Sequence, residues 1–148
     1  MMILGYPFKS PYPLTSPFGI RNNPFTGEKK QHNGCDYGVP EYTHIISVAD
    51  GVIIKSGWQA NPRTKENFMS IGFGLRVWQR IKLGGTPYDV FYAHCSAVTA
   101  MAGQKVLKGS VLALSGNTGR STGAHLHIGV RHAITYKWVE AAFLSCKH

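Results

Sequence analysis

This chain of 148 residues lacks three features that would mark it as a membrane protein, a secreted precursor or a cysteine-rich protein. It has no apolar run long enough to cross a membrane, and Met1–Leu4 is too short and lacks the basic lead of a secretory signal peptide. Its cysteines are few, odd in number and without a short-spaced pair, which argues against a disulfide framework and a C-x-x-C zinc site. They are Cys35, Cys95 and Cys146.

Acidic residues are also scarce. Only 7 Asp and Glu stand against 16 Lys and Arg, which gives a formal net charge of +9. This excess favours a polyanionic partner, such as nucleic acid, anionic lipid or an anionic bacterial wall, but does not choose among them. The scarcity also leaves few carboxylates for catalysis, and no H-E-x-x-H motif is present.

Prolines and aromatic side chains are concentrated in residues 1–31. Prolines at this density disfavour both a helix and a central strand. The aromatic side chains give the segment surface to bury, which argues against disorder. At this length the chain can bury the core of one domain. We therefore expect a single domain over 1–148, with residues 1–31 as an ordered, irregular, proline-rich arm packed on it.

The rest of the chain is a series of short strand patterns separated by glycine turns. β-Branched residues flank Asp50-Gly51 and predict a hairpin over 45–57. A long polar loop over 58–74 follows, and loops of this length are usually functional or mobile. Strands are predicted for 75–81 and 89–95, a turn and a strand within 103–118, and one short helix for 136–144. The pattern as a whole predicts an all-β fold.

Residues 119–130 combine a glycine-punctuated turn with a short strand that carries two histidines. Because successive side chains of a strand alternate, His125 and His127 share one face. Their Cα atoms would lie about 6.6 Å apart, so that one imidazole can hold a metal while the other flanks it. An ordinary half-buried strand with two polar histidines is the alternative that this pattern leaves open.

A second candidate pair is His32 and Asp36, four residues apart. The intervening glycine makes a helix unlikely, and an extended backbone also aims both side chains the same way. An imidazole and a carboxylate together suit a borderline cation such as zinc. A simple His–Asp hydrogen bond in a loop is the alternative. Cys35 is a possible thiolate ligand, but its odd offset from both residues points it the opposite way.

Taken in order, these motifs match a known family. The H-x-x-x-D of His32 and Asp36, the Y-A-H ending at His94, and the H-x-H ending at His127 resemble the lysostaphin-like (LytM-type) zinc endopeptidases, which cut peptide cross-bridges of bacterial peptidoglycan. The resemblance spans roughly 14–131 and departs at Ala124, where proline is common, and in the loop 58–74. It implies a single-domain antiparallel β-sandwich or open barrel with a groove over the sheet that holds the metal.

Carried over to this sequence, the resemblance implies that His32, Asp36 and His127 bind one Zn²⁺ and that water takes the fourth position. It places His125 beside that water and His94 on the neighbouring strand. Because no carboxylate other than Asp36 adjoins the motifs, we expect His94 and His125 to perform acid–base catalysis. We expect both to titrate near neutrality, with His125 as the base and His94 as the electrostatic donor. A purely structural histidine is the alternative for His94.

The expected function is hydrolysis of peptidoglycan peptide cross-links by a monomeric zinc enzyme whose net positive charge binds the anionic wall. Without an export signal, it would be a phage-type, bacteriolytic endolysin or part of a larger secreted or virion chain. One alternative is a non-catalytic LytM-like wall-binding or regulatory module, against which all five site residues argue. The other is a basic nucleic-acid-binding β-barrel, whose aromatics would alternate with Lys and Arg along exposed strands.

Overall fold

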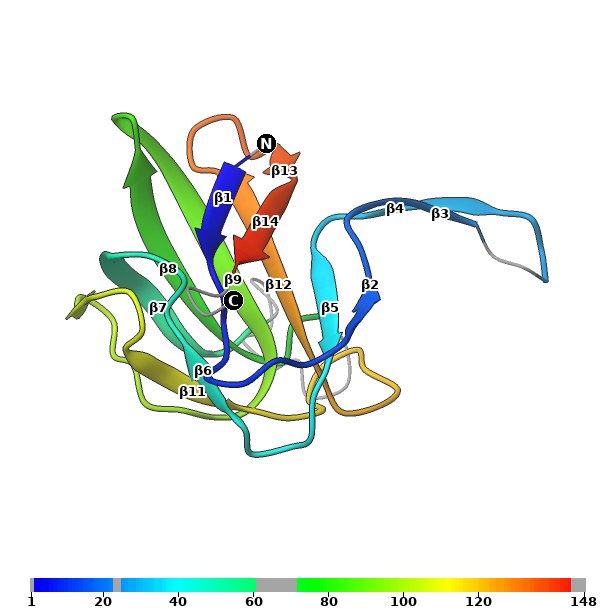
Figure 1. Ribbon diagram of the computed structural model, residues 1–148, viewed down its shortest axis with the longest axis horizontal. Helices are drawn as coiled ribbons and strands as arrows, with labels where there is room; N and C mark the ends of the chain where they lie inside the picture. The colour runs from blue at the N-terminus through cyan, green and yellow to red at the C-terminus, as the bar shows by residue number, and fades with distance from the viewer. Residues whose placement is uncertain (1, 23–24, 61–71, 145–148) are drawn as a thin grey trace.

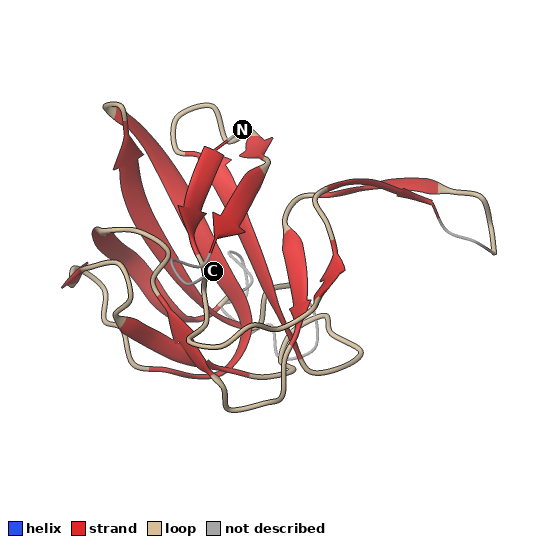
Figure 2. Cartoon of the chain, in the orientation of Figure 1, coloured by secondary structure: helices blue, strands red, loops and turns tan. Residues whose placement is uncertain are grey.

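The computed structural model describes residues 2–22, 25–60 and 72–144, which form strands and loops without a helix (Figure 2). None of these residues therefore forms a helix long and apolar enough to cross a membrane. In chain order the strands are β1 Met2–Gly5, β2 Leu14–Ser16, β3 Gly19–Asn22, β4 Lys29–His32, β5 Cys35–Gly38, β6 His44–Ile46, β7 Gly51–Trp58, β8 Leu75–Leu83, β9 Thr86–Val98, β10 Lys105–Val106, β11 Val111–Ser115, β12 His125–His132, β13 Trp138–Val139 and β14 Ala141–Leu144.

One large antiparallel sheet forms the body of the protein (Figure 1). Its strands follow the order β10-β7-β8-β9-β12-β5-β2, while β11 pairs with both β9 and β6, and β13 pairs with β12. The sheet stays open and does not close into a barrel. The expected all-β, mostly antiparallel fold is therefore confirmed, in its open form.

The core lies along the central strands. In β8, buried and partly exposed residues alternate from Leu75 to Ile81, as expected for a strand with one face against the core. Tyr92 of β9 is fully buried, and its hydroxyl donates to Gln79 Oε1 at 2.6 Å and accepts the backbone N–H of Val48 at 3.1 Å. These hydrogen bonds satisfy polar groups that would otherwise destabilise the core.

The N-terminal segment is more regular than expected. It contains four short strands: β1 pairs in parallel with β14, β2 pairs with β5, and β3 and β4 form a hairpin that projects from the body (Figure 1). The prediction of an irregular arm is wrong because Pro7, Pro11, Pro13 and Pro17 all fall between strands, so none removes a ladder hydrogen bond.

Aromatic side chains of residues 6–12 pack against the body of the protein, whereas Phe25 is exposed. Phe8 is buried, and its ring meets those of Tyr6, Tyr12 and Tyr37 edge to face at centroid distances of 5.1 to 5.7 Å. Tyr37 belongs to β5 and directly follows Asp36. The first part of the segment is thus held against the body through the back of the strand that carries Asp36.

Two further predictions of local structure are wrong. The strands flanking Asp50-Gly51 do not form a hairpin, because β6 pairs with β11 whereas β7 pairs with β8 and β10. The Asp50 carboxylate instead accepts the backbone N–H of Lys108 at 2.7 Å, so this turn redirects the chain. The helix expected over 136–144 is replaced by β13 and β14. Of the predicted loop 58–74, residues 61–71 lie outside the described part of the chain.

Candidate metal centre

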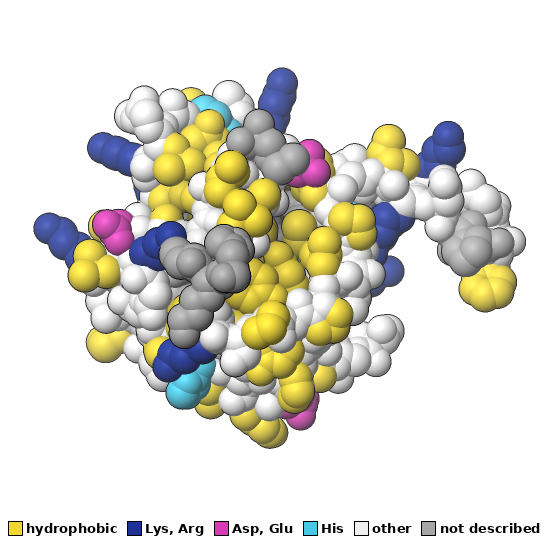
Figure 3. Space-filling model, viewed as in Figure 1, with side chains coloured by type: hydrophobic (Ala, Val, Ile, Leu, Met, Phe, Trp, Pro, Cys, Tyr) yellow, Lys and Arg dark blue, Asp and Glu magenta, His cyan; other side chains and the backbone are white. Residues whose placement is uncertain are grey.

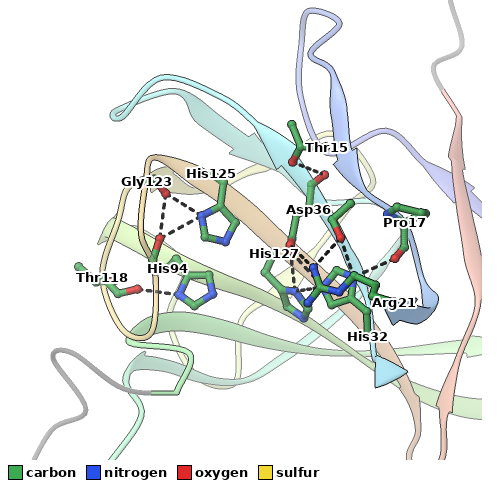
Figure 4. A network of polar contacts seen from close by, with 12 residues as sticks. Thr15, Pro17, Arg21, His32, Asp36, His94, Thr118, Gly123, His125 and His127 are labelled. Atoms are coloured by element: carbon green, nitrogen blue, oxygen red, sulfur yellow. Dashed lines mark hydrogen bonds and ion pairs between the residues drawn. The ribbon is translucent and has the colours of Figure 1, made fainter. Parts of the chain in front are cut away.

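A cavity of about 420 Å³ opens over the sheet where β4, β5, β9 and β12 meet. All five residues singled out from the sequence line it: His32, Asp36, His94, His125 and His127. Their surroundings, shown in Figure 4, divide them into a triad of mutually contacting side chains and a neighbouring pair of imidazoles.

The triad consists of His32, Asp36 and His127. Asp36 on β5 and His127 on β12 are direct cross-strand partners, and His32 ends β4 just before the turn into β5. Asp36 Oδ1 lies 2.8 Å from His127 Nδ1 and 3.3 Å from His32 Nε2, and these two nitrogens are 3.3 Å apart. The structure brings together the three side chains that the sequence grouped, although His32 and Asp36 lie on two strands and not on one.

The turn between β4 and β5 brings His32 and Asp36 together with His127 because its backbone closely approaches β12. A Cβ atom on Gly34 would lie 2.5 Å from the carbonyl oxygen of Ile128 and 2.9 Å from ring atoms of His127. Only glycine fits such a contact without displacing its neighbours. Gly34 therefore lets the turn pass over β12 and sets His32 beside His127.

The two triad imidazoles are held by contacts on their far sides. His32 Nδ1 donates to the carbonyl oxygen of Pro17 at 2.8 Å, which leaves Nε2 to face the other two ligand atoms. The ring of Phe73 stacks on His127 with a centroid distance of 5.7 Å and an interplanar angle of 28°. Such outer contacts fix the tautomer and the ring orientation of metal-binding histidines.

The protonation of Asp36 also suits a ligand. Burial alone would raise its pKa, but the interactions with His127 and His32 outweigh burial and hold the pKa well below its usual value. Asp36 is therefore an anion throughout the physiological range. An anionic oxygen and two imidazole nitrogens form a common ligand set for a borderline divalent cation.

The spacing of the three atoms fits a metal ion as well. Ligands about 2.0–2.2 Å from a tetrahedral Zn²⁺ lie roughly 3.3–3.6 Å from one another. The observed separations of 2.8 to 3.3 Å are close to this range. In the described part of the chain, this is the group of His, Cys, Asp and Glu side chains that could hold a metal. Cys35 is buried among apolar residues and does not belong to it.

The second pair is formed by His94 and His125, whose ring centroids lie 4.7 Å apart. His94 has a positive φ of 63°, and the β8–β9 register shifts here, so that a bulge turns its side chain toward the cavity. His94 Nδ1 donates to the carbonyl oxygen of Thr118 at 2.6 Å, and His125 Nδ1 donates to that of Gly123 at 2.8 Å. In both rings the Nε2 atom is the one not engaged by these carbonyls.

The expected titration of this pair near neutrality is wrong for His94. Burial lowers the pKa of His94 to about 4, although the hydrogen bond to Thr118 opposes this shift. His94 is therefore neutral at physiological pH, with Nδ1 protonated and Nε2 free to accept a proton.

Sequence reasoning missed several residues of the site. Phe73 stacks on His127, and its carbonyl oxygen accepts the backbone N–H of His94 at 2.8 Å, so it contacts both histidine groups. Arg21 and Lys30 line the cavity from the β3–β4 hairpin. The neighbouring prolines obscured the hairpin that carries Arg21 and Lys30. Nothing in the sequence around Phe73 distinguishes it from an ordinary loop aromatic.

Comparison with known proteins identifies relatives of this chain. The sequence model of peptidase family M23 matches residues 30–139. An uncharacterized metalloprotease of Haemophilus influenzae is 40% identical over 82% of this chain, and the peptidoglycan DD-endopeptidase ShyA of Vibrio cholerae is 34% identical over 82%. These matches cover 23% and 25% of the two relatives, so the chain spans about a quarter of their length.

Solved structures agree with the fold. The catalytic domain of the prophage-encoded M23 protein EnpA from Enterococcus faecalis, crystallised as a mutant, has a TM-score of 0.70 and 28% identity, covering 92% of this chain and 93% of that one. A zinc-containing peptidase from Vibrio cholerae has a TM-score of 0.69 and 31% identity, covering 91% and 37%. The catalytic domain of lysostaphin from Staphylococcus simulans shares the fold, with a TM-score of 0.69 at 23% identity over 87% and 88%.

The family match covers more than half of the chain and includes all the residues of the triad and of the imidazole pair. The resemblance to lysostaphin-like peptidases inferred from the motifs is thereby confirmed, and this chain belongs to peptidase family M23.

Proposed function

We propose that this protein is a zinc-dependent endopeptidase that hydrolyses the peptide cross-links of bacterial peptidoglycan. The observation that carries the proposal is the convergence of His32 Nε2, Asp36 Oδ1 and His127 Nδ1 at 2.8 to 3.3 Å beside the His94–His125 pair. The printed names of relatives supply the substrate class, because ShyA is a peptidoglycan DD-endopeptidase.

In this proposal His32, Asp36 and His127 hold the zinc ion. A zinc ion with three protein ligands supplies an acidified water molecule and polarises a carbonyl oxygen. The chain's own residues provide the rest. The Pro17 carbonyl keeps His32 in the tautomer whose Nε2 can bind metal, and Phe73 keeps the His127 ring in place.

We assign proton transfer to the imidazole pair. The Nδ1–H of His94 is held by Thr118, so Nε2 is left as the acceptor, which supports His94 as the general base. His125 is less buried, and its Nε2 can donate a hydrogen bond to the developing oxyanion or to the leaving amine once the ring is protonated. This division reverses the roles expected from the sequence alone.

We also propose how the protein is organised and how it reaches its substrate. Residues 1–148 act as one peptidase domain, with residues 1–31 packed on it, and the protein works as a monomer. Its net charge of +9 holds it on the anionic wall. More specifically, we propose that the protein acts on intact cells as a phage-type endolysin.

The test is digestion of purified peptidoglycan by the zinc-loaded protein. We expect about one zinc per chain by elemental analysis, new amino termini, and loss of cross-linked muropeptides in the mass spectrum. Removal of zinc by a chelator should stop the release, and added zinc should restore it. A protein that binds the wall stoichiometrically but releases no new amino termini would instead be a non-catalytic wall-binding module.

A further inference from the structure

The groove around the candidate metal triad has an unbalanced positive charge. Its lining includes Arg21, Lys30 and Arg120, whereas Asp36 is its one acidic residue in the described part of the chain. Since Asp36 belongs to the metal triad, it does not offset these cations when a metal is bound. The charge excess is greatest on the side formed by the β3–β4 hairpin, where two of the three cations lie.

Arg21 and Lys30 occupy an unfavourable position for two cations. They are direct cross-strand partners in the β3–β4 pair, next to the Gly19–His32 pair on the same face. Like charges directly opposite one another destabilise a strand pair. Among the ion pairs of the described residues, Lys30 has no acidic partner, and Arg21 has one contact, with Asp36 Oδ2 at 4.0 Å. A bound anion would relieve this repulsion.

The Arg21 guanidinium lies beside the metal triad (Figure 4). Its Nη1 donates to Ser16 Oγ at 2.7 Å, and its side chain remains 46% exposed. A guanidinium carries five N–H donors in a planar fork that matches a carboxylate. Within the described part of the chain, only Nη1 of Arg21 makes a hydrogen bond or ion pair, so the other donors are available to a ligand in the groove.

We propose that Arg21 and Lys30 form a subsite for a substrate carboxylate next to the bond that is cut. The substrate class is a peptide in which the carbon bonded to the scissile amide nitrogen also carries a free carboxylate, as in a direct cross-link from D-alanine to a diamino dicarboxylic acid. Summed bond lengths put that carboxylate carbon at most about 4.3 Å from the scissile carbonyl carbon. An oligoglycine bridge has no charge at this distance. This inference rests on the proposed peptidase function.

Three synthetic substrates test it with the zinc-loaded protein. The first is a D-alanyl–diamino acid cross-link with the free carboxylate, the second is the same peptide with a carboxamide there, and the third has an oligoglycine bridge. We expect kcat/KM to fall about 10- to 100-fold from the first to the second, the value of one hydrogen bond to a charged group. The third should be cleaved no better than the second.

Variants connect this preference to the subsite. Lys30→Gln and Arg21→Gln should lower kcat/KM on the carboxylate substrate with little change on the carboxamide substrate. The ratio of the two kcat/KM values should therefore approach one. Lys29→Gln is the matched control: it removes the same charge from the adjacent position, on the other face of β4 and outside the groove lining. Its ratio should stay at the wild-type value. Zinc content is measured for each variant. If Arg21→Gln loses zinc, the substrate ratio of Lys30→Gln alone tests the subsite.

The outcomes separate the two proposals. Equal cleavage of the carboxylate and carboxamide peptides, or a preference for oligoglycine, would overturn the subsite and leave the peptidase function standing. An unchanged ratio in zinc-loaded Lys30→Gln and Arg21→Gln would also overturn it. Cleavage of none of the three peptides would overturn the proposed function, and the subsite with it.

Discussion

At the scale of single residues, the orientation of each imidazole decides what it can do. Carbonyl oxygens of Pro17, Thr118 and Gly123 each engage the Nδ1 of one histidine: His32, His94 and His125, respectively. In His127, by contrast, Nδ1 faces Asp36 and His32. In His32, His94 and His125 the backbone thus assigns one ring nitrogen to structure and leaves the other for chemistry.

The ligand assignment makes a first prediction. Asp36→Ala should remove both bound zinc and activity, because it deletes the anionic ligand. Cys35→Ser should keep zinc, because the Cys35 thiol is buried on the opposite side of β5, although burying a hydroxyl there should cost about 1–3 kcal/mol of stability. Elemental analysis and urea unfolding measure the two effects. Zinc lost from Cys35→Ser but retained by Asp36→Ala would reverse the assignment.

The lowered pKa of His94 makes a second prediction, for the chelator-treated protein. The folded pKa of about 4 lies below the ordinary value of 6.5, so between these pH values the unfolded chain binds a proton that the folded chain does not. The free energy of unfolding should therefore fall as the pH drops from 6.5 to 4, by roughly 3 kcal/mol from this residue.

The matched variant for this prediction is His94→Asn. Asparagine tolerates the positive φ at this position, and its amide can donate to the Thr118 carbonyl, but it does not titrate. Urea unfolding of both proteins at pH 7 and pH 4.5 should show a smaller loss of stability in the variant. Equal losses would mean that His94 does not carry this dependence.

Some of the site residues could be predicted individually and others could not. Strand alternation alone placed His125 and His127 on one face, because no irregularity interrupts β12 between them. His94 reaches the cavity through a bulge, whose presence depends on the pairing of β8 with β9 and has no signal in either strand. Phe73 acts through a contact with a residue 54 positions away in the sequence, which no local pattern encodes.

At the scale of elements, strands with strong alternation were predictable and pairing partners were not. β8 was predictable from the alternation of its own side chains, since half-buried strands display their period, whereas residues 89–95 of β9 are all buried and do not alternate. The Asp50-Gly51 turn looked like a hairpin, but long-range pairing of β6 with β11 prevails. Likewise β14 appears only because β1 supplies a parallel partner, so its apolar residues were read as a helix.

The β4–β5 turn makes a third prediction. Gly34→Ala would place a methyl group against Ile128 and His127, so the turn must shift and the triad must open. We expect zinc affinity to fall about 10- to 100-fold, as for other changes just outside a ligand shell. Gly123→Ala is the control, because a Cβ there meets nothing within 4 Å. Competition with a fluorescent zinc chelator measures both, and equal affinities would show that the turn adapts.

At the scale of the whole molecule, charge and fold have separate consequences. The fold follows from alternation and burial, whereas a net charge of +9 concerns what the surface attracts. Lys and Arg side chains appear at several places on the face shown in Figure 3, including the projecting β3–β4 hairpin. A charge distributed in this way acts on an extended anionic surface as well as on a ligand in the groove.

This distribution makes the last prediction. Adsorption to a polyanionic wall sums many weak attractions, and salt weakens each, since the screening length is about 10 Å at 0.1 M and 3 Å at 1 M. Cleavage of intact walls should therefore decline steeply with added sodium chloride. A small soluble cross-bridge peptide engages only the groove, so its kcat/KM should decline much less. Lys55→Gln, which removes an exposed charge on β7 away from the groove, should shift the salt profile on walls and leave the soluble peptide unaffected. If walls and peptide share one salt profile, electrostatic adsorption does not target this protein to its substrate.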